Sequence, residues 1–144
     1  MPIKPILLVE DNLHDIELTI TALEQNKVTN PVVVTRHGGE ALDYLHRRGT
    51  FKERAPGHPI VIFLDLKMPK MDGLELLQHI KGDATLKTVP VVMLTSSREE
   101  SDLIKSYQLG VNAYVVKPVS FDQFIDAIRQ LGIFWGILNE QPRD

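Results

Sequence analysis

The chain has 144 residues, of which 43% are hydrophobic and 24% charged, and its formal net charge at pH 7 is −3. This length and apolar content predict one domain with a core of useful size. The slight acidic excess argues against partners such as nucleic acid or an anionic membrane. The apolar runs are too short to span a bilayer, no secretory signal pattern is present, and the absence of cysteine excludes disulfides. We therefore expect a cytoplasmic protein.

Short apolar runs suited to buried strands alternate with helical patterns along the chain. The expected strands cover residues 6–9, 32–35, 60–64, 89–94 and 112–116, and a helical pattern follows each of them. This alternation predicts βαβ units and a parallel sheet with helices on both faces. We therefore expect an α/β fold, a flavodoxin-like doubly wound sandwich with five strands in the order 2-1-3-4-5.

Capping residues and apolar positions locate the expected helices. Asn12 can cap the first helix, Ser97 can begin the fourth with a capping box, and Gly110 can end the fourth. The approximate apolar stripe of the first helix consists of Leu13, Ile16, Ile20 and Leu23, with Leu18 less well placed. The polar stretch Gly49 to His58 is expected to be a loop, made locally basic by Arg47, Arg48, Lys52 and Arg54.

Carboxylates follow two of the expected strands. Glu10 and Asp11 end the first, and Asp65 ends the third. In the expected strand order the topological switch point lies between these two strands, so their ends should converge. Three carboxylates at one point repel each other unless a cation joins them, and hard oxygen ligands favour Mg²⁺. Taken singly, each residue could equally be a helix cap or a solvated strand end.

Thr95 ends the fourth strand and Lys117 ends the fifth, which places both on the same rim. A hydroxyl and an ammonium there could bind and neutralise an anion on Asp65. In isolation they could also be a cap hydroxyl and a surface lysine. The bond from Lys117 to Pro118 is a candidate cis peptide. The combined set suits phosphoryl transfer onto Asp65 as the nucleophile.

The sequence resembles the receiver domain of two-component response regulators over about residues 5 to 131. The motifs that match are Ile-Leu-Leu-Val-Glu-Asp-Asn, Phe-Leu-Asp-Leu-Lys-Met-Pro followed by Met-Asp-Gly, the switch residue Thr95, and Ala-Tyr-Val-Val-Lys-Pro. Each motif alone is weak, but the four in this order are specific. The resemblance implies a phosphoacceptor with a sensor histidine kinase as its phosphodonor. Such a protein is not an enzyme, apart from catalysing its own phosphoryl uptake and slow autodephosphorylation.

The resemblance also implies roles for individual residues. Mg²⁺, with Mn²⁺ or Ca²⁺ as substitutes, would be held by Asp11, Asp65 and the carbonyl of Lys67, with Glu10 acting through water. Thr95 and Tyr114 would form the switch pair that reorients on phosphorylation. A narrower resemblance is to single-domain, chemotaxis-regulator-like proteins paired with bacterial phytochrome kinases. It rests on Val-Glu-Asp-Asn, on the basic insertion before the third strand and on residues 106–110. Any other stand-alone receiver is the alternative.

After Pro118 the sequence has room for a fifth helix and an extension over 132–144, but not for an output domain. The output should therefore be a protein contact. We expect a homodimer through the fourth helix, fifth strand, fifth helix and tail, because one helix face cannot bury all the apolar residues at this end. The expected interface residues are Tyr107, Ile133, Phe134, Trp135, Ile137 and Leu138. The alternative is a tail that folds back and closes the core.

Two other functions compete with this interpretation. A haloacid-dehalogenase-type phosphatase also has an aspartate nucleophile with Mg²⁺, but it needs a second Asp two residues later, where this chain has Lys67. A pseudo-receiver would bind partners without taking phosphate. The complete set of Asp11, Asp65, Thr95 and Lys117 argues against it.

Overall fold

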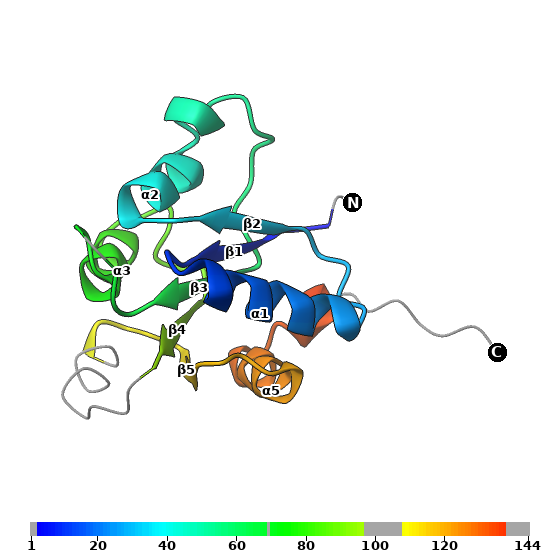
Figure 1. The fold of residues 1–144 in the computed structure, drawn as a ribbon. Coiled ribbons are helices and arrows are strands. Elements are labelled where there is room, and N and C mark those ends of the chain that lie inside the picture. Colours follow the sequence, from blue (N-terminus) through cyan, green and yellow to red (C-terminus); the bar gives the residue numbers. More distant parts are fainter. Residues whose placement is uncertain (1–2, 69, 97–107, 138–144) are drawn as a thin grey trace.

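The computed structural model describes residues 3–68, 70–96 and 108–137, which form a parallel sheet flanked by helices (Figure 1). The strands are β1 (Ile6–Val9), β2 (Val32–Thr35), β3 (Val61–Asp65), β4 (Val91–Thr95) and β5 (Ala113–Val116). Their order is β2-β1-β3-β4-β5, which confirms the predicted flavodoxin-like topology. In the register, Val9 pairs with both Thr35 and Leu64, and Thr95 pairs with Val116. The residues that follow these positions therefore meet at one edge of the sheet.

Helices cover both faces of this sheet (Figure 1). The helices are α1 (Leu13–Gln25), α2 (Gly38–His46), α3 (Gly73–Lys81) and α5 (Phe121–Leu131), and the 3-10 turns are η1 (Gly49–Phe51) and η2 (Phe134–Gly136). One face packs against α2 and α3, and the other against α1 and α5. The expected fourth helix, with its Ser97 cap and Tyr107, lies outside the described residues. None of the described helices has the length and apolar character needed to cross a membrane.

The central strands are buried on both faces, as their unbroken apolar sequences predict. Every residue of β1, β3 and β4 is buried. Phe63 of β3 stacks on Phe124 of α5 with ring centroids 5.3 Å apart. Complete burial of an apolar side chain stabilises a fold by about 1.5–3 kcal/mol. The buried sheet therefore holds the polar side chains at its carboxyl edge in fixed positions.

The apolar stripe predicted for α1 is partly wrong. Ile16 and Leu23 are buried, but Leu13 is 60% exposed and Leu18 is 38% exposed. At about 100° per residue, position 18 lies on the opposite side of the helix from position 16. Thr19 takes the inward position instead, and its hydroxyl donates a hydrogen bond to the Asp15 main-chain oxygen at 2.9 Å.

The segment after α5 folds back onto the sheet, so the alternative weighed for the tail is correct for part of it. Ile137 is buried and Ile133 packs against the same core, whereas Phe134 and Trp135 are 49% and 76% exposed. The expectation that Ile137 lies on an exposed surface is therefore corrected, because its side chain closes the core. Leu138 lies outside the described residues.

The turn after α5 is fixed by one buried amide. The Asn30 side-chain nitrogen donates hydrogen bonds to the main-chain oxygens of Lys4 at 3.1 Å and Gly136 at 2.8 Å. Gly136 lies against Ile60 so closely that an added Cβ would come within 2.6 Å of the Ile60 Cδ1 atom. These contacts join residues far apart in the sequence at the edge of the sheet opposite the strand ends discussed below.

The basic loop before β3 uses its cations mainly to hold itself together. The Arg54 side chain donates to the main-chain oxygens of Tyr44 at 2.7 Å and Gly57 at 3.0 Å, and its guanidinium lies 4.1 Å from the Tyr44 ring centroid. Arg48 pairs with Asp43 at 2.9 Å. The positive charge noticed in the sequence is therefore largely engaged within the loop.

Candidate functional site

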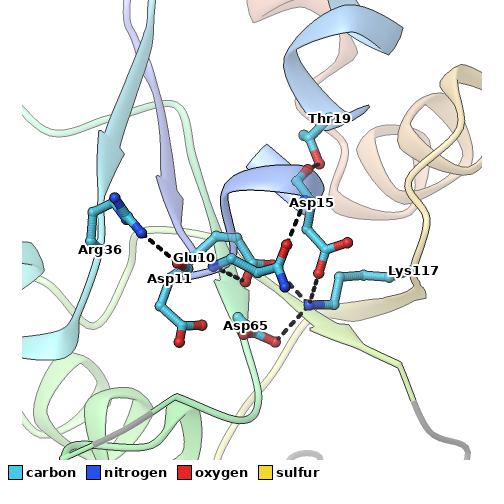
Figure 2. Close-up of polar contacts among 8 residues, drawn as sticks. Glu10, Asp11, Asp15, Thr19, Arg36, Asp65 and Lys117 are labelled. Atoms are coloured by element: carbon cyan, nitrogen blue, oxygen red, sulfur yellow. Dashed lines mark hydrogen bonds and ion pairs between the residues drawn. The ribbon is translucent and has the colours of Figure 1, made fainter. Parts of the chain in front are cut away.

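The carboxyl ends of β1 and β3, the start of α1 and Lys117 after β5 enclose a cleft of about 510 Å³ (Figure 2). The lining residues are Glu10, Asp11, Asn12, Leu13, Asp15, Arg36, Asp65, Lys67, Ser96 and Lys117. Four of these are carboxylates and three are cationic, so negative charge is in excess. The structure thus brings together the predicted Glu10, Asp11, Asp65, Lys67 and Lys117.

Asp65 is the last residue of β3 and is only 3% exposed. Burial raises the pKa of the Asp65 carboxyl group, and the hydrogen bond and charge of Glu10 raise it further, to about 7, although Lys117 acts in the opposite direction. Glu10 is 1% exposed, so both acids are almost completely buried. This is the environment that makes a carboxylate respond strongly to an added cation.

The start of α3 packs directly on the main chain of Asp65. The Gly73 main-chain nitrogen donates to the Leu66 oxygen at 2.8 Å, and an added Cβ at Gly73 would collide with the main-chain oxygen of Asp65. Asp72 caps the same helix by accepting a hydrogen bond from the Glu75 nitrogen at 2.9 Å. The Asp72-Gly73 pair of the Met-Asp-Gly motif therefore allows the close packing that fixes Asp65.

Lys117 joins three carboxylates (Figure 2). Its Nζ atom lies 2.9 Å from Glu10 Oε1, 2.9 Å from Asp15 Oδ2 and 3.2 Å from Asp65 Oδ1. Burial alone would lower the pKa of Lys117, but the hydrogen bonds to Asp15 and Glu10 and the charge of Asp65 outweigh burial and raise that pKa. The peptide bond between Lys117 and Pro118 is cis, as the sequence suggested.

The acidic residues fit a divalent cation. Glu10, Asp11 and Asp65 each offer a carboxylate oxygen, and these atoms lie within 4.8 Å of one another. Within the described part of the chain, the carboxylate of Asp11 accepts no hydrogen bond, so its oxygens are available as ligands. An all-oxygen donor set of this kind suits a hard divalent ion. Lys67, whose carbonyl is the remaining predicted ligand, lines the same cleft.

Neither of the two predicted switch residues is among the residues that line the cleft. Thr95 ends β4 and is 2% exposed, whereas Tyr114 of β5 is 42% exposed. Tyr114 pairs in register with Met93, which shares a sheet face with Thr95 because side chains alternate along a strand. Tyr114 also lines a groove of about 290 Å³ between β5 and α5.

Two functional side chains in the cleft were not predicted from the sequence. Asp15 binds Lys117, and the Arg36 Nη2 atom donates to the main-chain oxygen of Asp11 at 2.7 Å. Asp15 lies in the first turn of α1, one turn beyond the acidic pair, and Arg36 directly follows β2. Their nearness to the expected rim is the signal that could have found them.

Residues 6–129 match the family model of the response regulator receiver domain. This chain belongs to the response regulator receiver domain family. Receiver domains are phosphoacceptors that partner with sensor histidine kinases and are generally not enzymes. The cleft described above is therefore the part of the molecule in which phosphoacceptor chemistry is to be sought.

Several relatives are similar over nearly the whole receiver. The response regulator Rcp1 of Synechocystis sp. is 38% identical over 134 residues, which cover 93% of this chain and 90% of Rcp1. The solved structure of the bacteriophytochrome response regulator AtBRR is 61% identical, with a TM-score of 0.89 over 97% of this receiver and 100% of that chain. The Mn²⁺-bound form of Rcp1 has a TM-score of 0.75 at 35% identity, and the match covers 97% of this chain and 99% of the Rcp1 chain. The phosphorylated cyanobacterial phytochrome response regulator RcpA has a TM-score of 0.74 at 42% identity. That match covers 92% of this chain and 91% of the RcpA chain.

Proposed function

We propose that this receiver accepts a phosphoryl group on Asp65 from a sensor histidine kinase and thereby switches a protein-interaction face. The observation that carries the proposal is the position of Asp65. It is a buried strand-end carboxylate on the cleft, 3.2 Å from the Lys117 ammonium and grouped with Glu10 and Asp11. Glu10 is equally buried and also contacts Lys117, but it lies beyond the end of β1, and its two oxygens already accept hydrogen bonds from Lys117 and from the Asn12 nitrogen.

In the proposed transfer, an Asp65 oxygen attacks the phosphorus atom of a phosphohistidine. The P–N bond breaks as the P–O bond to Asp65 forms, and the histidine leaves as a neutral imidazole whose other ring nitrogen carries the proton it already held in the phosphohistidine. Lys117 neutralises charge on the phosphoryl oxygens, because its ammonium already lies beside Asp65. The Thr95 hydroxyl, at the end of the neighbouring strand, donates a hydrogen bond to the same group.

We further propose that the metal ligands are Asp11, Asp65 and the carbonyl of Lys67, with Glu10 acting through water and with Mg²⁺ as the ion. When bound, the ion would offset the charge of the carboxylates and of the transferred phosphoryl group. The Mn²⁺-bound form of Rcp1 supports a divalent site, and we expect Mn²⁺ and Ca²⁺ to substitute. Asp11 suits the role because its carboxylate is free of hydrogen bonds from the described residues.

The switch is proposed to run from Asp65 through Thr95 to Tyr114. Phosphoryl on Asp65 draws the Thr95 hydroxyl and the Lys117 ammonium toward it, and Tyr114 then moves inward from its exposed position. The groove between β5 and α5, which Tyr114 lines, would change shape with it. This is the face whose affinity for a partner is expected to respond to phosphorylation.

A second copy of the chain is the partner proposed for this end of the molecule. Phe134 and Trp135 are held outward on a turn whose other apolar residues are packed into the core. Exposed aromatic residues on a fixed turn are typical of an interaction surface. Sedimentation velocity at micromolar concentration tests the proposal, and a monomer both with and without phosphorylation would contradict it.

The competing functions have less support. A phosphatase would need a general acid two residues after Asp65, and Lys67 occupies that position. A pseudo-receiver would not require an aspartate, a lysine and an acidic pair at one cleft. Turnover of a phosphomonoester would favour the former, and an Asp65 variant that signals normally would favour the latter.

The cognate kinase is proposed to be a bacterial phytochrome, because the similar AtBRR and RcpA are described as phytochrome response regulators. The test is phosphotransfer from a bacteriophytochrome histidine kinase phosphorylated with labelled ATP. We expect label on the wild-type chain and none on Asp65→Asn, with a non-phytochrome histidine kinase as the control donor. Equal transfer from both kinases would contradict the phytochrome pairing, and label on Asp65→Asn would contradict the choice of acceptor.

A further inference from the structure

Arg36 holds the loop that carries Asp11. Arg36 directly follows β2, and its Nη2 atom donates a hydrogen bond to the main-chain oxygen of Asp11 at 2.7 Å (Figure 2). Among the described residues, this is the one hydrogen bond that a side chain makes to Asp11. A charged donor bonded to a carbonyl at this distance makes a comparatively strong hydrogen bond.

The main chain of Arg36, whose side chain bonds to Asp11, is itself held in place. The main-chain nitrogen of Arg36 donates to Glu40 Oε1 at 2.8 Å, and the Glu40 nitrogen donates to His37 Nδ1 at 3.1 Å, so the start of α2 fixes the Arg36 backbone. The Glu10 nitrogen donates to the Thr35 oxygen at 3.0 Å, which extends the pairing of β1 with β2 by one residue. Arg36 therefore connects the rigid end of β2 to the first residue beyond this pairing.

The carboxylate of Asp11 has no such support of its own, since it accepts no hydrogen bond from the described residues. Its position relative to Glu10 and Asp65 is thus set by the main chain that Arg36 holds. We propose that Arg36 is a positioning residue for the metal site, which keeps the Asp11 carboxylate where it can share a cation with Asp65. This inference rests on the proposed role of Asp11 as a metal ligand.

The hydrogen bond of Arg36 to Asp11 and the positive charge of Arg36 should have opposite effects on Mg²⁺ affinity. A guanidinium near a cation site repels the incoming cation, so removing the positive charge alone would tighten Mg²⁺ binding. Loss of the hydrogen bond would let the Asp11 loop relax and would weaken Mg²⁺ binding. Partners that orient metal ligands typically change affinity by about 10- to 100-fold when they are removed. The sign of the change therefore separates the two effects.

The test is calorimetric titration of Mg²⁺ into the metal-free full chain. We expect Arg36→Met, which keeps the apolar stem, to bind Mg²⁺ about ten-fold more weakly than wild type. Arg36→Lys keeps the charge and one donor group without the planar fork, so it should recover part of the loss. The matched control is Arg48→Met, which removes an exposed arginine paired with Asp43 outside the cleft and should bind Mg²⁺ as wild type does.

Thermal melting in EDTA shows whether Arg36→Met is folded. If it is not, the Mg²⁺ affinity of Arg36→Lys tests the positioning role instead. Affinity at or above the wild-type value in the folded variants would overturn the anchoring role while leaving the metal site intact. No Mg²⁺ binding by the wild-type chain would instead overturn the proposed metal site, and the inference with it. As a second readout, Arg36→Met should need more Mg²⁺ for half-maximal phosphorylation by acetyl phosphate yet reach the wild-type rate at saturation.

Discussion

The ammonium nitrogen of Lys117 lies 3.2 Å from a carboxylate oxygen of Asp65, and it also lies 2.9 Å from oxygens of both Glu10 and Asp15. One cation therefore serves three carboxylates, of which Glu10 and Asp65 are almost completely buried. A single ammonium cannot offset that much buried negative charge. The metal-free cleft is therefore poised to gain a further cation.

This charge imbalance predicts that Asp65→Asn stabilises the metal-free protein. The pKa of Asp65 is raised to about 7, so the ionised side chain weakens the fold above pH 7, and this penalty fades as the pH falls toward the ordinary value of 3.8. We expect the free energy of unfolding of the variant at pH 8 to exceed that of wild type by on the order of 1–3 kcal/mol. The difference should shrink between pH 7 and pH 5.

Urea unfolding in EDTA at several pH values measures this difference. Asp122→Asn, which changes an exposed aspartate in the first turn of α5, is the control and should stay within about 0.5 kcal/mol of wild type. An Asp65→Asn protein that is less stable than wild type at pH 8 would show that Lys117 already balances the cluster.

A second prediction concerns the coupling between Asp65 and the β5–α5 face. Thr95→Ala removes a hydroxyl at a position that is 2% exposed, and it leaves the acidic residues untouched. We expect the variant to take up phosphate while its sedimentation no longer responds to phosphorylation. Thr95→Ser keeps the hydroxyl and should respond as wild type does. A Thr95→Ala chain whose sedimentation responds normally would remove Thr95 from the switch.

A third prediction concerns the turn after α5. Asn30→Ala leaves the main-chain oxygens of Lys4 and Gly136 without this donor, and a buried unpaired polar group costs about 1–3 kcal/mol. The variant should lose stability in that range, and the fluorescence of Trp135, the single tryptophan, should change as the turn loosens. Gln25→Ala, at the exposed end of α1, is the control. Unchanged emission in Asn30→Ala would mean that other contacts fix the turn.

Much of the site could be predicted because it depends on strand ends. Glu10, Asp65, Thr95 and Lys117 each follow or end an unbroken apolar run, and a parallel sheet places the ends of all its strands on one rim. Once the strand order was inferred, their convergence followed from topology alone. The fold could be predicted for the same reason, since βαβ alternation and buried strands leave few arrangements open.

Asp15 and Arg36 could not be found in this way, because their roles depend on how far a side chain reaches. In the sequence, Asp15 looks like an acid favoured in the first turn of a helix, and Arg36 looks like a surface arginine after a strand. The sequence also does not indicate that Ile137 is buried while Trp135 is exposed. This difference depends on the buried amide of Asn30, more than a hundred residues earlier in the chain.

Intact mass after incubation with Mg²⁺ and acetyl phosphate shows whether Asp65 is the phosphoacceptor. We expect the wild-type chain and the Asp122→Asn control each to gain the mass of one phosphoryl group, and Asp65→Asn to gain none. Equal gain by Asp65→Asn and wild type would show that the phosphoryl group resides on a side chain other than Asp65.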